Sequence, residues 1–67
     1  MSKYEVRDYI DLWTYKFNTE DEAREAIHVH ANSLGYTFHM ETYFRGNSFL
    51  CFYDELGQTM TYIISKC

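Results

Sequence analysis

The sequence predicts an α+β domain in the order β-α-β-β-β, with one helix packed on one face of a four-stranded, mainly antiparallel sheet. Three observations predict this fold. One stretch has the capped, amphipathic pattern of a helix, several stretches are rich in strand-forming residues, and short glycine-containing turns separate the last three strands. With 67 residues and no proline, the chain is expected to form a single domain over residues 1–67.

The first strand is expected within the first 18 residues, where aromatic and β-branched residues are frequent, and most strongly over residues 9–17. Both of its alternating sets of side chains are partly apolar, which leaves its buried face open. A break near Asp8 is compatible with this pattern. We place the strand at a sheet edge, where a helical crossover would make it parallel to its neighbour.

The helix is the clearest element. Thr19 and Glu22 have the spacing of a capping box, in which the hydroxyl and the carboxylate each accept a hydrogen bond from a backbone N–H at the helix start. Gly35 suits the left-handed conformation that ends many helices. Small and apolar residues recur between them at helical spacing and predict one buried face: Ala23, Ala26, Ile27, His30, Ala31 and Leu34.

Three further strands are expected at about residues 36–45, 48–55 and 58–66, with turns at Gly46-Asn47 and Leu56-Gly57. If both turns are even in length, paired residues share predictable sheet faces. The face expected under the helix carries Phe38, Met40, Thr42, Phe44, Phe49, Cys51, Tyr53, Met60, Tyr62 and Ile64. The outer face then carries His39, Glu41, Tyr43, Leu50, Phe52, Asp54, Thr59, Thr61, Ile63 and Ser65. A turn of odd length would break this assignment.

The expected outer face has an apolar centre and a polar, acidic margin, which is typical of a protein interface. Because one helix covers only one face of a sheet, we expect this surface to bind a partner. The expected partner-binding residues are Glu41, Tyr43, Leu50, Phe52, Asp54 and Ile63. The alternative is that the first strand or the N-terminus folds over this face.

Residues 45–55, RGNSFLCFYDE, resemble the signature octapeptide of the RNA-recognition motif. The matching residues are Arg45, Gly46, Ser48, Phe49, Leu50 and Phe52, whereas Asn47 stands where a base-stacking aromatic belongs. With the similar opening segment LWTYKFNTEDEAREAI, the resemblance covers about half of the chain. It implies a single-stranded RNA-binding module whose aromatics stack on bases, away from the helices. The expected register instead turns Phe49 toward the helix, and the motif's second helix has no counterpart between Tyr53 and Met60.

Charge and composition narrow the function classes. Ten acidic and six basic residues give a net charge of −4, and the basic residues are spread along the sequence, which disfavours nucleic acid as a partner. His28 and His30 point about 200° apart around a helix, and no spacing matches a zinc site, so no metal or cofactor is expected. Cys51 lies in an apolar strand pattern, as a buried cysteine does, and no catalysis is expected.

The expected function is that of a small non-catalytic protein-binding domain, an inhibitor or modulator that occupies a surface of a larger protein or complex. In size and composition it resembles the small inhibitors and host-takeover proteins of bacteriophages and mobile elements, including anti-CRISPR proteins. A structural homodimer is the further alternative. No stretch reaches the ~20 apolar residues of a membrane span and no signal sequence is apparent, so a cytoplasmic location, in a bacterial or host cell, is expected.

Overall fold

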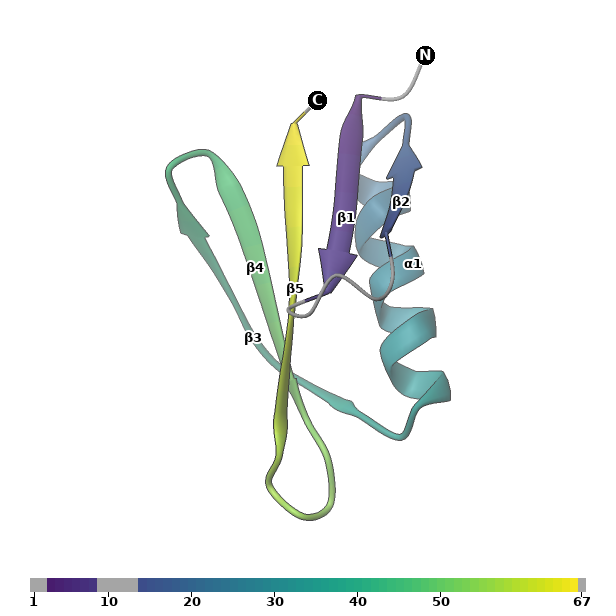
Figure 1. The fold of residues 1–67 in the computed structure, drawn as a ribbon, viewed down its shortest axis with the longest axis vertical. Coiled ribbons are helices and arrows are strands. Elements are labelled where there is room, and N and C mark those ends of the chain that lie inside the picture. Colours follow the sequence, from purple (N-terminus) through teal and green to yellow (C-terminus); the bar gives the residue numbers. More distant parts are fainter. Residues whose placement is uncertain (1–2, 9–13, 67) are drawn as a thin grey trace.

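A computed structural model of the protein describes residues 3–8 and 14–66 (Figure 1). Its elements are β1 (Tyr4–Asp8), β2 (Thr14–Phe17), α1 (Glu20–Ser33), β3 (Thr37–Phe44), β4 (Asn47–Tyr53) and β5 (Thr59–Lys66). The strands form one antiparallel sheet in the order β2-β1-β5-β4-β3, and α1 packs against one face of it. The predicted α+β class is confirmed. The prediction of four strands is wrong, because the described part of the chain contains five.

The additional strand arises because the N-terminal region forms a hairpin. β1 and β2 pair antiparallel, with Val6 opposite Tyr15. β1 ends at Asp8, where a break was expected, and residues 9–13 of the predicted strand lie outside the described residues. The reversal puts β2 at the sheet edge and places β1 inside the sheet, antiparallel to β5. The parallel neighbour predicted for the first strand is therefore wrong.

α1 is capped at both ends by the predicted residues. The Thr19 hydroxyl accepts a hydrogen bond from the Glu22 N–H (3.1 Å), as predicted, and it donates one to the Glu22 carboxylate (3.1 Å). The carboxylate thus bonds the Thr19 hydroxyl and not the backbone N–H that the capping box predicts. At the other end Gly35 adopts φ +87°. The Tyr36 N–H then reaches back to the Ala31 carbonyl (3.0 Å), which satisfies one of the last helical acceptors.

The core lies between α1 and the sheet. Its buried residues are Val6, Ala23, Ile27, Ala31, Leu50, Phe52, Tyr62 and Ile64. Three of these come from the predicted helix face, whereas Leu34 is exposed. Because the helix contributes small alanines, large sheet side chains fill the space beneath it. The Phe52 and Tyr62 rings meet edge to face there, with centroids 5.6 Å apart.

The turn lengths determine which strand residues face α1. The β3–β4 turn consists of Arg45 and Gly46, whose φ values of 52° and 82° suit a two-residue hairpin turn. It lies one residue earlier than predicted but keeps the predicted even length. The β4–β5 connection spans residues 54–58, because Tyr53 pairs with Thr59, and its length is odd. Compared with the prediction, β3 and β4 therefore present their opposite faces to α1, whereas β5 presents the predicted face.

The odd connection reverses most of the predicted faces of β3 and β4. Leu50 and Phe52 are fully buried against α1, so the prediction that they lie on the outer face is wrong. Residues predicted for the core that face the other way are Met40, Thr42, Phe44, Phe49, Cys51 and Tyr53. In β5 the prediction is confirmed, because Met60, Tyr62 and Ile64 contribute to the core.

Asp54 organises the odd connection. Its Oδ1 accepts hydrogen bonds from the backbone N–H groups of Leu56 (3.0 Å) and Gln58 (2.8 Å). The Gly57 N–H donates to the Asp54 carbonyl (3.1 Å), and Gly57 adopts φ +82°. Aspartate at the first position and glycine at the fourth are typical of a type I turn. The left-handed glycine adds the residue that makes the connection odd.

A bulge in β3 restores the predicted orientation at one position. Phe38 pairs with Phe52, and the register shifts before Met40, so His39 is an extra residue on this strand. The Phe38 ring therefore returns to the helix side, 5.5 Å from the Phe52 ring and 5.1 Å from the His28 ring. Phe38 and Met40, which were predicted to share a face, lie on opposite faces.

Candidate functional site

No described element covers the sheet face opposite α1, which we name the open sheet face. Its members are Glu5 and Arg7 of β1, Thr14 and Lys16 of β2, Thr37, Met40, Thr42 and Phe44 of β3, Asn47, Phe49, Cys51 and Tyr53 of β4, and Thr59, Thr61, Ile63 and Ser65 of β5. Figure 1 shows α1 lying along the other side of the sheet, where it contacts β1, β2, β3 and β5. Of all the surfaces on the described part of the chain, this face is the main candidate for binding.

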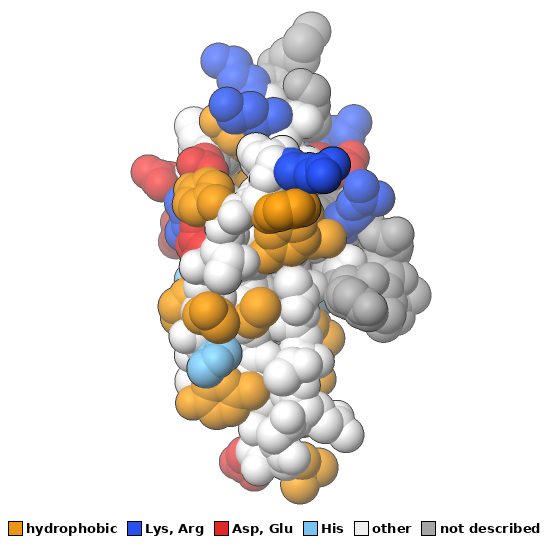
Figure 2. All heavy atoms as spheres, turned by 90° about the vertical axis from the view of Figure 1, so that its left-hand side faces the viewer, with side chains coloured by type: hydrophobic (Ala, Val, Ile, Leu, Met, Phe, Trp, Pro, Cys, Tyr) orange, Lys and Arg blue, Asp and Glu red, His pale blue; other side chains and the backbone are white. Residues whose placement is uncertain are grey.

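The open sheet face is apolar at its centre. Phe49 and Ile63 pair across β4 and β5, and both are half-buried. The apolar character continues to the β3 edge, where Phe44 is 62 % exposed and Met40 is 45 % exposed. Figure 2, which looks onto the β3 edge of the sheet, shows several hydrophobic side chains (orange) exposed along that edge. Connected exposed apolar side chains of this kind mark interaction sites.

Basic side chains gather at one end of the molecule. Figure 1 shows both termini and the β3–β4 turn at this end, and Figure 2 shows most Lys and Arg side chains (blue) there. They come from separate parts of the sequence: Lys3, Arg7, Lys16, Arg45 and Lys66. Although the basic residues are spread along the sequence, as stated above, antiparallel pairing brings these distant strand ends together.

Arg45 joins this basic end to the apolar surface. Its guanidinium carbon lies 5.3 Å from the centroid of the Phe44 ring, within cation–π range. Its backbone adopts φ +52°, a left-handed conformation that costs most L-residues roughly 1–2 kcal/mol. Asparagine or glycine is the usual residue at such a turn position. Backbone strain of this kind is concentrated at functional sites, so Arg45 is a candidate binding residue.

The structure separates the six residues predicted to bind a partner. Leu50 and Phe52 belong to the core, and Ile63 lies on the open sheet face, where it was expected. Asp54 lies in the β4–β5 connection, where its carboxylate holds the turn. These side chains therefore form no common surface.

The last two predicted residues, Glu41 and Tyr43, lie on the helix side of β3. Arg24 of α1 binds Glu41 through two hydrogen bonds, from Nε to Oε1 (3.0 Å) and from Nη2 to Oε2 (2.9 Å). The hydrogen bonds to Glu41 raise the pKa of Arg24 above its usual range. Glu41 thus links β3 to α1. Tyr43 is 65 % exposed, but it lies on the helix side of the sheet and not on the outer face where it was predicted.

Sequence reasoning missed Met40, Phe44, Phe49 and Tyr53 as surface residues because it assigned them to the core. Two signals in the sequence favour the observed arrangement. The octapeptide resemblance orients Phe49 away from the helix. The turn signature of aspartate at position 54 and glycine three residues later favours an odd connection.

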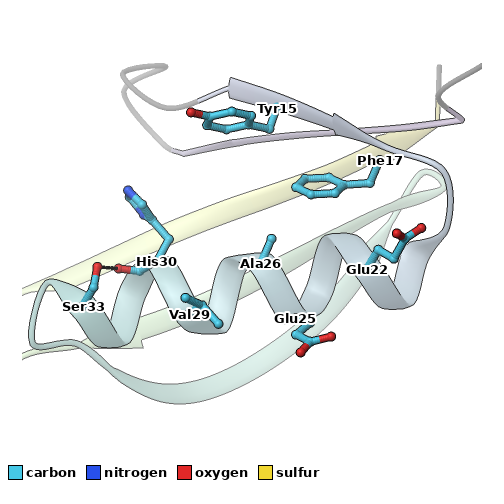
Figure 3. Close-up of a pocket in the computed structure, with 8 residues that line it drawn as sticks. All are labelled: Tyr15, Phe17, Glu22, Glu25, Ala26, Val29, His30 and Ser33. Carbon is cyan, nitrogen blue, oxygen red and sulfur yellow. Dashed lines mark hydrogen bonds between the residues drawn. The ribbon is translucent and has the colours of Figure 1, made fainter.

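A second surface is the groove between α1 and β2 (Figure 3). It is an open groove with a volume of about 640 Å³, lined by Tyr15, Phe17, Glu22, Glu25, Ala26, Val29, His30 and Ser33. Figure 3 shows the Phe17 ring projecting from β2 toward the helix, above Ala26, with Glu22 and Glu25 on the first half of α1. The groove therefore combines an apolar lining with carboxylates.

His30 connects the groove to the core. Its Nδ1 lies 2.6 Å from the Tyr62 hydroxyl, a hydrogen bond whose donor depends on the histidine tautomer. Burial, together with the charges of Asp8 and Tyr36, raises the pKa of Tyr62 to about 12. Tyr62 is therefore a neutral hydroxyl at physiological pH, and the contact serves to hold α1 on β5.

Cys51 and His39, which belong to residue types common in metal and catalytic sites, each contact a side chain of a neighbouring strand. Within residues 3–8 and 14–66, no group of three or more His, Cys, Asp and Glu is arranged to hold a metal ion. The Cys51 Sγ lies 3.7 Å from the Thr61 hydroxyl on the open sheet face. The His39 ring packs edge-on against Tyr53.

The helix of the described residues, α1, has 14 residues and is too short and too polar to span a membrane.

Comparisons with protein-family models, with curated proteins and with solved structures found no match. Any function is therefore inferred from the residues of the open sheet face and of the groove.

Proposed function

We propose that this protein is a non-catalytic protein-binding domain that uses the open sheet face to occupy a surface of a larger protein or complex, as an inhibitor or modulator does. The observation that carries this proposal is the row of exposed apolar side chains on a sheet face that no described element covers. Burial of apolar surface drives most protein association. Binding of a partner to the open sheet face would therefore be favoured by the removal of its apolar side chains from water.

The composition of the open sheet face suits a protein partner. Aromatic residues, methionine and arginine are enriched in protein interfaces, and acidic residues are depleted there. Phe44, Met40 and Phe49 supply the enriched types at and around the centre of this face. Tyr53, which is 42 % exposed, adds a ring with a polar hydroxyl. Glu5 is the one acidic member among the described residues of the face, and Lys16 lies opposite it.

The sheet also lowers the cost of binding. Immobilising a flexible side chain at an interface costs about 0.5–1.5 kcal/mol, and aromatic side chains on strands have few rotamers to lose. Phe49 and Ile63 are already half-buried by their strand neighbours, so they need little further ordering. Met40, with its unbranched thioether, adapts its shape to a partner surface.

Affinity capture tests the proposal. The tagged protein is used to capture partners from the cells in which it is expressed, and these partners are identified by mass spectrometry. Phe49→Glu places a carboxylate at the centre of the open sheet face, and Gln58→Glu places the same group on the exposed β4–β5 connection as a control. We expect the control to retain the wild-type partner and Phe49→Glu to lose it, with both variants folded by circular dichroism. Equal capture by all three proteins contradicts the proposal.

Single-stranded RNA binding is the second candidate, because the structure orients the octapeptide as that function requires. Phe49 and Asn47 face away from α1, whereas Leu50 and Phe52 face the core. Arg45 lies at the turn before these residues, so a base stacked on Phe49 has a cation near its phosphate.

This candidate stands second for two reasons. The connection of residues 54–58 replaces the second helix of the RNA-recognition motif, and the chain carries a net charge of −4 with its cations at one end. Fluorescence anisotropy with single-stranded oligonucleotides at low salt tests it. RNA binding predicts steep weakening with added salt and loss of affinity in Phe49→Ala. No binding at low salt removes this candidate.

A homodimer is the remaining alternative, and β3 is the element that favours it. β3 is an edge strand of eight residues, and its side chains are almost all exposed. Long exposed edges pair readily with a second chain. Analytical ultracentrifugation of the pure protein tests this arrangement: concentration-dependent dimerisation that Tyr43→Lys reduces supports it, and a monomer at all concentrations excludes it.

A further inference from the structure

The groove between α1 and β2 lies on the helix side of the sheet, apart from the open sheet face. Val29 is 64 % exposed and Tyr15 is also exposed, whereas Phe17 and Ala26 are half-buried between them. Figure 3 shows Tyr15 and Phe17 on β2, Ala26 pointing toward Phe17 from α1, and Val29 on the outer side of the helix. The groove therefore has an apolar lining that solvent reaches along its length.

We propose that this groove binds an extended segment of a partner protein that carries apolar residues at alternate positions and lysine or arginine beside them. The segment lies alongside β2 and continues the sheet over α1. This site is separate from the open sheet face, so the inference goes beyond the proposed function and does not depend on it.

The strand geometry argues for an extended segment. In the described sheet β2 is an edge strand whose strand neighbour is β1. Edge strands recruit extended segments through main-chain hydrogen bonds, and pockets beside the edge then select alternate side chains. Alternate residues of a strand point the same way about 6.6 Å apart. Side chains of an added strand that point toward α1 would meet the apolar groups of Phe17, Ala26 and Val29.

The charges of the groove select a basic segment. Glu22 and Glu25 line it, Glu22 from the β2 side of α1 and Glu25 from the side that faces away from β2 (Figure 3). No described lysine or arginine lines the groove. Arg24, the basic residue nearest in sequence, is held on the other side by Glu41 at 2.9 Å. Lysine or arginine in the segment therefore meets complementary charge, and an acidic segment is repelled.

Selection of random peptides displayed on phage, with the full protein as bait, tests the inference. We expect a consensus of alternating apolar residues with lysine or arginine enriched between them. A synthetic peptide of that consensus should bind about tenfold more weakly to Val29→Lys and to Glu25→Lys, because one variant loses an apolar contact, the other loses a carboxylate, and both add a positive charge. Both residues are exposed, so both variants should fold. Phe49→Glu, on the open sheet face, is the matched control and should bind the peptide as the wild type does.

Charge reversal supplies an independent measurement. A peptide in which glutamate replaces lysine should bind Glu25→Lys more tightly than it binds the wild type. Nuclear magnetic resonance should place the shifted amides in β2 and α1. The inference is overturned by the absence of any enriched sequence, or by a consensus without basic residues or with helical spacing. It is also overturned by peptide binding that Phe49→Glu abolishes and Val29→Lys does not. These outcomes concern only the groove. None of them bears on the proposal that the open sheet face binds a partner, which affinity capture tests separately.

Discussion

Phe52 lies opposite Met60 in the β4–β5 ladder, and both side chains contribute to the core under α1. This pairing follows from the odd number of residues in the connection 54–58. An even connection would place Phe49 against the helix and leave Phe52 on the surface. Because both alternating sets of β4 side chains contain aromatic residues, the turn determines which set is available to a partner.

Truncation of neighbouring residues in β4 tests this register. Leu50→Ala should lower the free energy of unfolding by about 2–5 kcal/mol, because the side chain is fully buried and leaves a cavity. Phe49→Ala should cost roughly half as much or less, because the ring is partly solvated already. Urea unfolding followed by circular dichroism measures both. A larger loss for Phe49→Ala than for Leu50→Ala would show that the faces are reversed.

The ion pair between Arg24 and Glu41 should stabilise the docking of α1 on β3. Both side chains are partly buried and joined by two hydrogen bonds, so a double-mutant cycle with Arg24→Ala and Glu41→Ala should give a coupling of about 1 kcal/mol. The cycle of Arg24 with Asp21, which lies 3.6 Å away but is fully exposed, is the control and should give a smaller coupling. Equal couplings would contradict a structural role for Glu41.

Tyr62 should make stability fall in strongly alkaline solution. Burial, followed by the charges of Asp8 and Tyr36, raises the pKa of Tyr62 from 10.0 to about 12. The unfolded chain therefore loses this proton first, so the contribution to stability is full below pH 10 and is lost as the pH rises to 12. Urea midpoints across this interval should fall less steeply in Tyr62→Phe than in the wild type. Identical slopes would show that this hydroxyl is not protected by folding.

The same variant should be less stable at neutral pH. Tyr62→Phe removes the hydrogen bond to His30 Nδ1, which is 2.6 Å long, and should lower the free energy of unfolding by about 1 kcal/mol. Val29→Ala, on the exposed side of the same helix, is a control that should change stability little. A neutral effect of Tyr62→Phe would mean that water replaces the bond at no cost.

Arg45→Asn should separate stability from binding. Asparagine tolerates the φ of +52° better than arginine, so the variant should keep the wild-type stability or gain up to about 1 kcal/mol despite losing the contact with Phe44. It should nevertheless capture less partner, because the cation at the edge of the open sheet face is gone. Unchanged capture together with a loss of stability would assign Arg45 a purely structural role.

The elements that depend on short-range chemistry could be predicted from the sequence. Thr19 and Gly35 act within a few residues of their own positions, and they cap α1 as expected. β3, β4 and β5 also lie within a few residues of their predicted bounds, because alternating apolar residues and glycine turns are local signals.

The candidate site depends on long-range register and could be predicted only in part. The prediction for Ile63 is correct because the predicted faces of β5 are correct. The prediction for Leu50 and Phe52 is wrong because the connection 54–58 has one residue more than an even-length turn, which exchanges the two faces of β4. The extra residue at His39 carries no glycine or other marker in the sequence. The clustering of the basic residues is likewise a property of strand pairing, which their dispersed positions in the sequence do not reveal.

Hydroxyl-radical footprinting of the captured complex tests the central claim, that a partner covers the open sheet face. Met40, Phe44 and Tyr53 are exposed in the free protein, and their oxidation reports their solvent exposure. Leu56, exposed on the β4–β5 connection, serves as the internal reference. We predict that oxidation of Met40, Phe44 and Tyr53 falls in the complex while that of Leu56 does not change. Unchanged oxidation of Met40 and Phe44 in a complex that protects other residues would contradict the account.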